Sequence, residues 1–106
     1  MEANGLWVPL EQVSEFEIYK RKVQGITESV VHLIPGYDAN KRGLNGGDNH
    51  QVDHIYSITQ GFKNNVPPEI IGHVANLRFI HWKENNEKAS ECDITLEELY
   101  ARTGHL

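Results

Sequence analysis

The stretch QVDHIYS places an acid and an imidazole side by side, at Asp53 and His54. Carboxylate oxygens are ligands that hard divalent cations prefer, and a neutral imidazole can take a proton from water at physiological pH. Asn76 follows, with Asn85 nine positions later. The amide oxygen of Asn85 completes a cation site if a turn brings the chain back beside Asp53. We therefore expect Asp53 and Asn85 to bind a metal ion, and His54 to activate water for phosphodiester hydrolysis.

The expected ion is Mg²⁺, with Mn²⁺, Ni²⁺ or Zn²⁺ as alternatives. Mg²⁺ binds oxygen ligands at about 2.0 to 2.1 Å, retains several waters and needs only one or two protein side chains. Beside a general base, such an ion acts as a Lewis acid and stabilises charge on the leaving oxygen of a phosphodiester. One carboxylate and one amide oxygen are therefore a sufficient ligand set.

Two strands and a helix must position these residues. Residues 51–57 are rich in strand formers, and an extended chain would project Asp53 and His54 from opposite faces. Residues 76–82 alternate in side-chain type and predict a second strand, and residues 83–91 are polar enough for a short exposed helix. In that order, the elements bring the helix back beside the first strand.

Helix geometry selects between two consecutive asparagines. Successive helical side chains diverge by about 100° around the axis, so only one of Asn85 and Asn86 can face the first strand. The step from Asn76 selects Asn85 as the ligand and leaves Asn86 as a solvated residue.

The flanking segments predict further elements. Ser14 and Glu17 have the spacing of a capping box, which predicts a first helix over residues 14–23. Residues 27–38 are compatible with a short strand or a helical turn, and this alternative stays open. Residues 38–50 have the Gly, Asn and Asp content of a loop.

The remaining segments are an ordered loop and a final helix. Between the two strands, Gly, Asn and Pro residues predict a loop with one turn of helix near Pro68–Ile71. Thr95 and Glu98 form a second capping-box pattern, and Gly104 marks the end of the helix that follows.

Length and composition limit the classes of function. A chain of 106 residues predicts one domain, 1–106, with room for one site. A net charge of −5 argues against a protein that coats nucleic acid by charge alone. The lone Cys92 excludes an intrachain disulfide framework. No apolar run long enough for a membrane span and no secretion-signal pattern occur, so we expect a soluble cytoplasmic protein without membrane contact.

The segment from Gln51 to about Ser90 resembles the HNH endonuclease family. In that family an Asp-His or His-His pair on a strand is followed by an Asn that opens the next strand and by an Asn or His ligand within a helix. Here the order is Asp53-His54, Asn76 and Asn85, with Asn-Leu and Asn-x-x-Lys matching as well. More loosely, YKRKV, KRGLNGG and GFKNNVPPEIIGH look like segments of small bacteriophage HNH proteins, including homing-type nucleases.

The resemblance implies an α+β fold with a ββα-metal core (HNH, or His-Me finger) flanked by N-terminal and C-terminal helices. It implies a DNA endonuclease in which Asp53 and Asn85 bind the metal, His54 is the general base and Asn76 holds the loop that orients the base. Two departures matter. Relatives often carry CxxC pairs around a structural zinc, which Cys92 alone cannot form, so apolar packing must replace it. Homing enzymes usually carry a separate DNA-recognition segment, whereas few residues follow the core here.

Basic residues supply candidate phosphate contacts. Lys20, Arg21 and Lys22 equally suit the negative end of a helix dipole. The full set of candidates comprises Lys20, Arg21, Lys22, Lys41, Arg42, Lys63, Arg78, Lys83 and Lys88.

Three alternatives to a complete nuclease remain. The acidic balance and small size favour a catalytically silent HNH-like module that binds another protein. A second alternative is a nuclease subunit whose DNA-recognition part is on another chain. The third is a purely structural role, with His54 as a core histidine and Asn76 as a turn residue.

Overall fold

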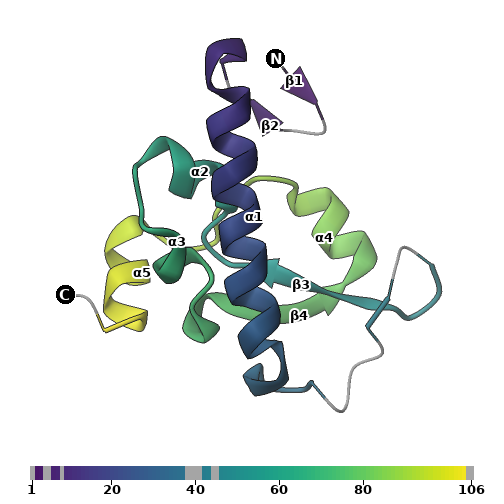
Figure 1. Ribbon diagram of the computed structural model, residues 1–106. Helices are drawn as coiled ribbons and strands as arrows, with labels where there is room; N and C mark the ends of the chain where they lie inside the picture. Colours follow the sequence, from purple (N-terminus) through teal and green to yellow (C-terminus); the bar gives the residue numbers. More distant parts are fainter. Residues whose placement is uncertain (1, 4–5, 8, 38–41, 44–45, 105–106) are drawn as a thin grey trace.

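The computed structural model describes all residues except 1, 4–5, 8, 38–41, 44–45 and 105–106. It is a small α+β domain in which a long helix, α1, lies across a two-stranded antiparallel sheet (Figure 1). The strands and α-helices are β1 (Glu2–Ala3), β2 (Leu6–Trp7), α1 (Val13–Val30), β3 (His50–His54), α2 (Ile58–Lys63), α3 (Pro68–Ile71), β4 (Leu77–His81), α4 (Trp82–Lys88) and α5 (Leu96–Arg102). Short 3₁₀-helices occupy Leu10–Gln12, Val31–Leu33 and Val74–Asn76.

The two faces of the β3–β4 sheet have different partners. Val52 lies opposite Phe79, and both pack with Val31 and Ile34 at the carboxyl end of α1. On the other face, Asp53 lies opposite Arg78 and points toward α4, where Lys88 bonds to it. The strand alternation therefore directs the side chains of Val52 and Asp53 to opposite faces of the sheet.

The predicted opposite orientation of Asp53 and His54 is confirmed. Asp53 faces α4, whereas His54 bonds to Thr27 of α1. The predicted strand over residues 51–57 is too long at its carboxyl end, because β3 ends at His54. Beyond His54, the N–H groups of Ile55 and Tyr56 bond to Asn76 and turn the chain away from β4.

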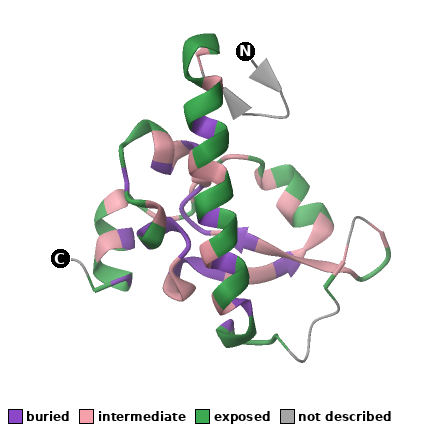
Figure 2. Ribbon diagram, in the orientation of Figure 1, coloured by how far each residue is buried: buried purple, intermediate pink, exposed green. Residues whose placement is uncertain are grey.

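Helix α1 differs from the prediction at both ends. Gln12, not Ser14, is its N-cap, and no side chain caps it, because a 3₁₀-turn leads directly into the first turn. The capping box at Ser14 was therefore wrong. At the other end, the helix continues to Val30 because its buried face continues beyond Val23 to Thr27. In the described part of the segment whose conformation stayed open, residues 27–37, the structure shows helix to Val30 followed by a 3₁₀-turn over Val31–Leu33. Most of the outward side of α1 is exposed (Figure 2).

The segment between the strands is more helical than predicted. The turn Pro68–Ile71 is confirmed as α3, but α2 replaces the expected irregular loop at residues 58–63. Ser57 caps α2 by accepting a hydrogen bond from the Gln60 N–H at 3.1 Å. Ile71 packs directly against Gly61 of α2, and a Cβ at position 61 would lie only 2.7 Å from the Ile71 side chain, so a larger residue would force the packing to shift.

The main core lies where α1, α2, α3 and α5 meet. Its buried apolar residues are Val23, Tyr56, Val66, Ile70, Ile71 and Leu99. Cys92 is partly buried against the same cluster. The expected apolar packing is thus present, with the single cysteine as part of it.

The last two helices agree with the sequence patterns. Strand β4 lies within the predicted strand over residues 76–82, and α4 begins at Trp82, one residue before the predicted helix, and ends at Lys88, three residues before its predicted end. The capping box of Thr95 and Glu98 is formed at the start of α5. Gly104 follows α5 with a φ of 76°, a conformation that favours glycine. None of the helices in the described part of the chain combines the length and apolar character that a membrane crossing needs.

The segment predicted as a loop over residues 38–50 is described only in part. Residues 38–41 and 44–45 lie outside the described residues. Arg42 forms an isolated parallel bridge with His50, and β3 already begins at His50. His50 is therefore a strand residue rather than a loop residue, because it pairs with His81 of β4.

Candidate active site

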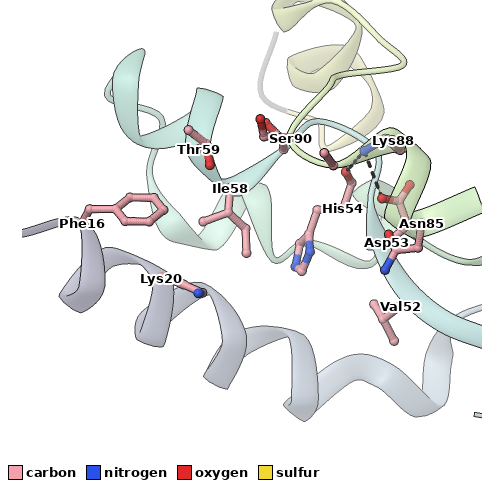
Figure 3. Close-up of a pocket in the computed structure, with 12 residues that line it drawn as sticks. Phe16, Lys20, Val52, Asp53, His54, Ile58, Thr59, Asn85, Lys88 and Ser90 are labelled. Atoms are coloured by element: carbon pink, nitrogen blue, oxygen red, sulfur yellow. Dashed lines mark hydrogen bonds and ion pairs between the residues drawn. The ribbon is translucent and has the colours of Figure 1, made fainter. Parts of the chain in front are cut away.

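A cavity of about 180 Å³ opens along β3, between α1 and α4. Asp53 and His54 line it from the strand, and Asn85 and Lys88 line it from α4 (Figure 3). Lys20 reaches it from α1. The structure thus brings three of the four predicted site residues together, and the fourth, Asn76, lies behind them.

Asn76 joins the segment after His54 to the start of β4. Its side chain is fully buried, with 0% exposure. Its Oδ1 accepts a hydrogen bond from the Tyr56 N–H at 2.7 Å, and its Nδ2 donates to the carbonyls of Tyr56 at 3.1 Å and Ile71 at 2.8 Å. Its main-chain carbonyl accepts from the Ile55 N–H at 2.9 Å. Every polar group of the Asn76 side chain is therefore used to hold the chain just beyond His54.

His54 is an uncharged ring at neutral pH. The pKa of His54 is lowered to about 4, mainly by burial, while the Asp53 carboxylate opposes this shift and the Lys88 ammonium adds to it. Burial disfavours the charged form of an imidazole, which is the physical cause of the shift. The ring Nε2 lies 2.9 Å from the Thr27 hydroxyl oxygen. A neutral ring in this position retains one lone pair that can accept a proton.

Asp53 is a buried carboxylate between two cations. It is 4% exposed, and its Oδ2 accepts from Arg78 Nε at 2.8 Å while its Oδ1 accepts from Lys88 Nζ at 2.9 Å. Lys88 also donates to the main-chain carbonyl of His54 at 2.9 Å. Arg78 bonds in addition to Asp93. Two predicted phosphate contacts, Arg78 and Lys88, are thus directed at Asp53 in this structure.

Two side chains at the cavity carry oxygen donors of the kind that a hard divalent cation binds. Each oxygen of the Asp53 carboxylate has two lone-pair positions, and the contacts with Arg78 and Lys88 use one on each. Asn85 donates through Nδ2 to Gln51 Oε1 at 2.8 Å, and its Oδ1 has no partner among the described residues. One carboxylate, one amide oxygen and waters match the way Mg²⁺ is usually bound.

The choice of Asn85 over Asn86 agrees with the structure. Asn85 is half-buried and faces β3, whereas Asn86 is exposed. Within the described ranges, no cluster of three His, Cys, Asp or Glu side chains could hold a metal. The predicted ligands, one carboxylate from Asp53 and one amide from Asn85, do not belong to such a cluster.

The other candidate phosphate contacts lie at varying distances from the cavity. Lys20 lines it, while Arg21 and Lys22 are exposed on α1. Arg42 is paired with Glu28 at 2.5 Å, which raises the pKa of Arg42, and lines a second cavity beside His54. Lys63 and Lys83 are exposed, and Lys41 lies outside the described residues.

Thr27 was not identified from the sequence as a site residue. It belongs to residues 27–38, whose conformation the sequence left open, so its position on a buried helix face could not be assigned. Its spacing of four residues from Val23 is the signal that could have identified it, because such residues share a helix face. A second signal is that Thr27 is a polar residue on an otherwise apolar helix face, which indicates a specific hydrogen-bonding partner.

Comparisons of the chain with protein-family models, curated proteins and solved structures gave no match. The geometry around Asp53 and His54 is therefore the basis on which a function is inferred.

Proposed function

We propose that the protein is a metal-dependent endonuclease that hydrolyses phosphodiester bonds of DNA. The observation that carries the proposal is that one cavity contains the uncharged ring of His54 together with the oxygen donors of Asp53 and Asn85. The order β3, β4, α4 supports a ββα-metal core of the HNH type. The buried bonds of Asn76 support its role in holding the base, because they fix the chain within two residues of His54.

Each residue has a distinct part in the proposed reaction. His54 accepts a proton from the water whose oxygen attacks phosphorus, and the phosphorus–oxygen bond to the leaving group breaks. Asp53 and Asn85 would hold a divalent cation, expected to be Mg²⁺, which when bound supplies Lewis-acid stabilisation of charge on the phosphodiester. Lys20 lies at the cavity and can pair with a phosphate oxygen.

The direct test is cleavage of supercoiled plasmid in the presence of Mg²⁺, Mn²⁺, Ni²⁺ or Zn²⁺. His54→Ala should reduce the cleavage rate by about 100-fold or more, because a general base lowers the barrier of the chemical step. His32→Ala is the matched control, since His32 is exposed and lies on the 3₁₀-turn after α1. Circular dichroism should show a folded protein in both variants. A wild-type rate for His54→Ala would overturn the proposal.

A second candidate function is a silent HNH-like module that binds another protein. The favouring observation is that both oxygens of Asp53 already bond to cations, with the Lys88 side chain only 8% exposed. Calorimetric titration with Mn²⁺ separates the two. A nuclease site should bind the ion and lose affinity in Asp53→Asn, while Asn86→Ala remains as wild type. A silent module should show no binding that depends on Asp53.

The remaining alternative is a subunit that needs another chain to recognise DNA. Size-exclusion chromatography with and without DNA addresses this directly. A protein that cleaves plasmid as purified and elutes with DNA needs no second chain. Binding to DNA only after a partner is added would favour the subunit instead.

A further inference from the structure

We propose that Thr27 of α1 is a positioning residue that fixes the tautomer of His54, so that Nδ1 carries the lone pair available to accept a proton. This inference rests on the proposed function for its catalytic meaning. The tautomer itself is a property of the folded protein without metal or DNA, and it can be measured separately.

The hydrogen bonds around Thr27 determine which ring nitrogen carries the proton. The Thr27 hydroxyl oxygen lies 2.8 Å from the carbonyl oxygen of Val23. A carbonyl can only accept, so the single hydroxyl proton is donated there. The remaining contact, 2.9 Å to His54 Nε2, then requires the ring nitrogen to donate. A neutral imidazole has one N–H, so Nδ1 is unprotonated.

The opposite tautomer makes fewer hydrogen bonds. If Nδ1 carried the proton, Nε2 would have to accept from Thr27, which would take the hydroxyl proton away from Val23. The Nδ1–H group would also have no hydrogen-bond acceptor among the described residues. The Nε2–H tautomer keeps both the Thr27–Val23 bond and the Thr27–His54 bond, which favours the proton on Nε2.

The ring needs such an anchor because apolar packing does not enclose it. His54 lines the cavity toward α4 and also a second cavity of about 420 Å³, which Thr27 and Gln24 line from α1. A ring with space on two sides is not fixed by close contacts alone. The Thr27 hydrogen bond is the one described contact of a ring nitrogen.

Thr27 occupies a position where the fold does not require a hydroxyl. It is 3% exposed on a helix face whose other buried residues are Phe16 and Val23. Valine has nearly the same shape and would satisfy the packing there. The hydroxyl is therefore explained by its bond to His54 rather than by burial, and α1 contributes to a site otherwise built from β3 and α4.

The test is long-range ¹⁵N–¹H NMR of the His54 ring at neutral pH, in the protein without metal or DNA. Wild type should show the Nε2–H tautomer. Thr27→Val should lose that preference and Thr27→Ser should restore it, because serine keeps the hydroxyl. Thr103→Val is the matched control, since Thr103, the C-cap residue of α5, makes the same kind of bond, to the Leu99 carbonyl at 2.9 Å. An Nδ1–H ring in wild type overturns the inference without any variant.

Cleavage kinetics then separate this inference from the proposed function. Thr27→Val should lower the cleavage rate by about 10- to 100-fold, the usual effect of removing a partner that orients a functional histidine, and Thr27→Ser should recover most of it. If the tautomer depends on Thr27 but wild type cleaves no DNA, the proposed function fails and the assignment of the tautomer stands. If cleavage depends on His54 but the tautomer is unchanged in Thr27→Val, the inference about Thr27 fails and the proposed function stands.

Discussion

The two ends of the β3–β4 strand pair both carry histidines, but they are held in different ways. At one end, His54 lies opposite Leu77, beside the buried Asn76. At the other end, His50 lies opposite His81, with ring centroids 5.7 Å apart. We call these the site end and the far end. The same residue type on the same two strands therefore meets two different environments.

At the far end, each histidine donates a ring N–H to a carbonyl of the loop before β3. His81 donates through Nε2 to the Gly47 carbonyl at 3.0 Å and accepts at Nδ1 from the Lys83 N–H at 3.2 Å. His50 donates through Nδ1 to the Asp48 carbonyl at 2.8 Å. Both nitrogens of His81 are thus occupied while the ring is neutral. Because Nδ1 of His81 accepts the Lys83 N–H at the start of α4, the neutral ring has no lone pair left to accept a proton.

At the site end, the contacts come from side chains that are distant in sequence. Asn76 bonds across 20 residues to Tyr56, and Thr27 bonds across 27 residues to His54. These bonds leave His54 Nδ1 without a partner among the described residues. The comparison shows that His54 is a candidate base because one ring nitrogen is held by Thr27 while the other has no partner among the described residues.

The largest effect is expected at Asn76. Asn76→Ala should lower the free energy of unfolding by about 3 to 5 kcal/mol, because it leaves buried main-chain groups of Tyr56 and Ile71 without partners. Asn86→Ala, on the exposed side of α4, is the control and should change it by less than about 0.5 kcal/mol. Urea denaturation measures both. Equal small effects would mean that Asn76 does not hold the site end.

The next effect concerns the pH dependence of stability. Burial lowers the pKa of His54 to about 4 in the folded protein, against about 6.5 for an unfolded histidine. Between these values the unfolded chain binds more protons, so stability falls as the pH is lowered from about 6.5 toward 4. Relative to His54→Leu, which cannot titrate there, wild type should lose about 2 to 3 kcal/mol over this range.

Urea denaturation of both proteins at a series of pH values gives this difference. Above about pH 7.5 the difference between wild type and His54→Leu should be constant, because His54 is then neutral in both folded and unfolded states. A difference that stays constant down to pH 4 would contradict the burial of the His54 ring.

Local patterns were enough to predict the elements of the far end and of α5. The alternation over residues 76–82 predicted β4, and the spacing of Thr95 and Glu98 predicted the cap of α5, because both signals lie within one element. The choice of Asn85 over Asn86 needed only the angular step of a helix. The capping box predicted at Ser14 does not form, although Ser14 and Glu17 have the required spacing. The 3₁₀-turn before α1 starts the helix at Val13, so Ser14 lies inside it.

The site end depends on contacts that the sequence does not encode locally. Thr27 and His54 meet only because α1 continues past Val23 and crosses β3, and nothing near either residue predicts that crossing. The engagement of Asp53 by Lys88 likewise depends on how α4 packs on the sheet. The sequence was therefore enough to select Asp53, His54 and Asn85 as candidates, but not to predict that Thr27 and Lys88 bond to them.

The smallest effects are expected at the two far-end histidines, His81 and His50. The His81 ring caps α4 and bonds to the Gly47 carbonyl, and both contacts are exposed. His81→Ala should therefore lower the free energy of unfolding by about 1 kcal/mol, the usual cost of losing an N-cap. His81→Asn should recover part of this loss, because asparagine is a good N-cap but its side chain is too short to replace the bond from Nε2 to the Gly47 carbonyl. His50→Ala should cost less, since its ring makes one exposed bond to the loop and caps no helix.

Urea denaturation compares these variants, and the NMR signal of the His54 ring reports whether they disturb the site end. The His54 tautomer should be the same in wild type and His81→Ala, because His81 bonds to main-chain groups of Gly47 and Lys83 and not to the side chain that holds His54. If His81→Ala destabilises the protein as much as Asn76→Ala, or shifts the His54 tautomer, the two ends are not independent. The strand pair would then transmit changes along its length, and the contrast between its ends would not explain why the Nδ1 lone pair of His54 has no partner among the described residues while that of His81 is bonded.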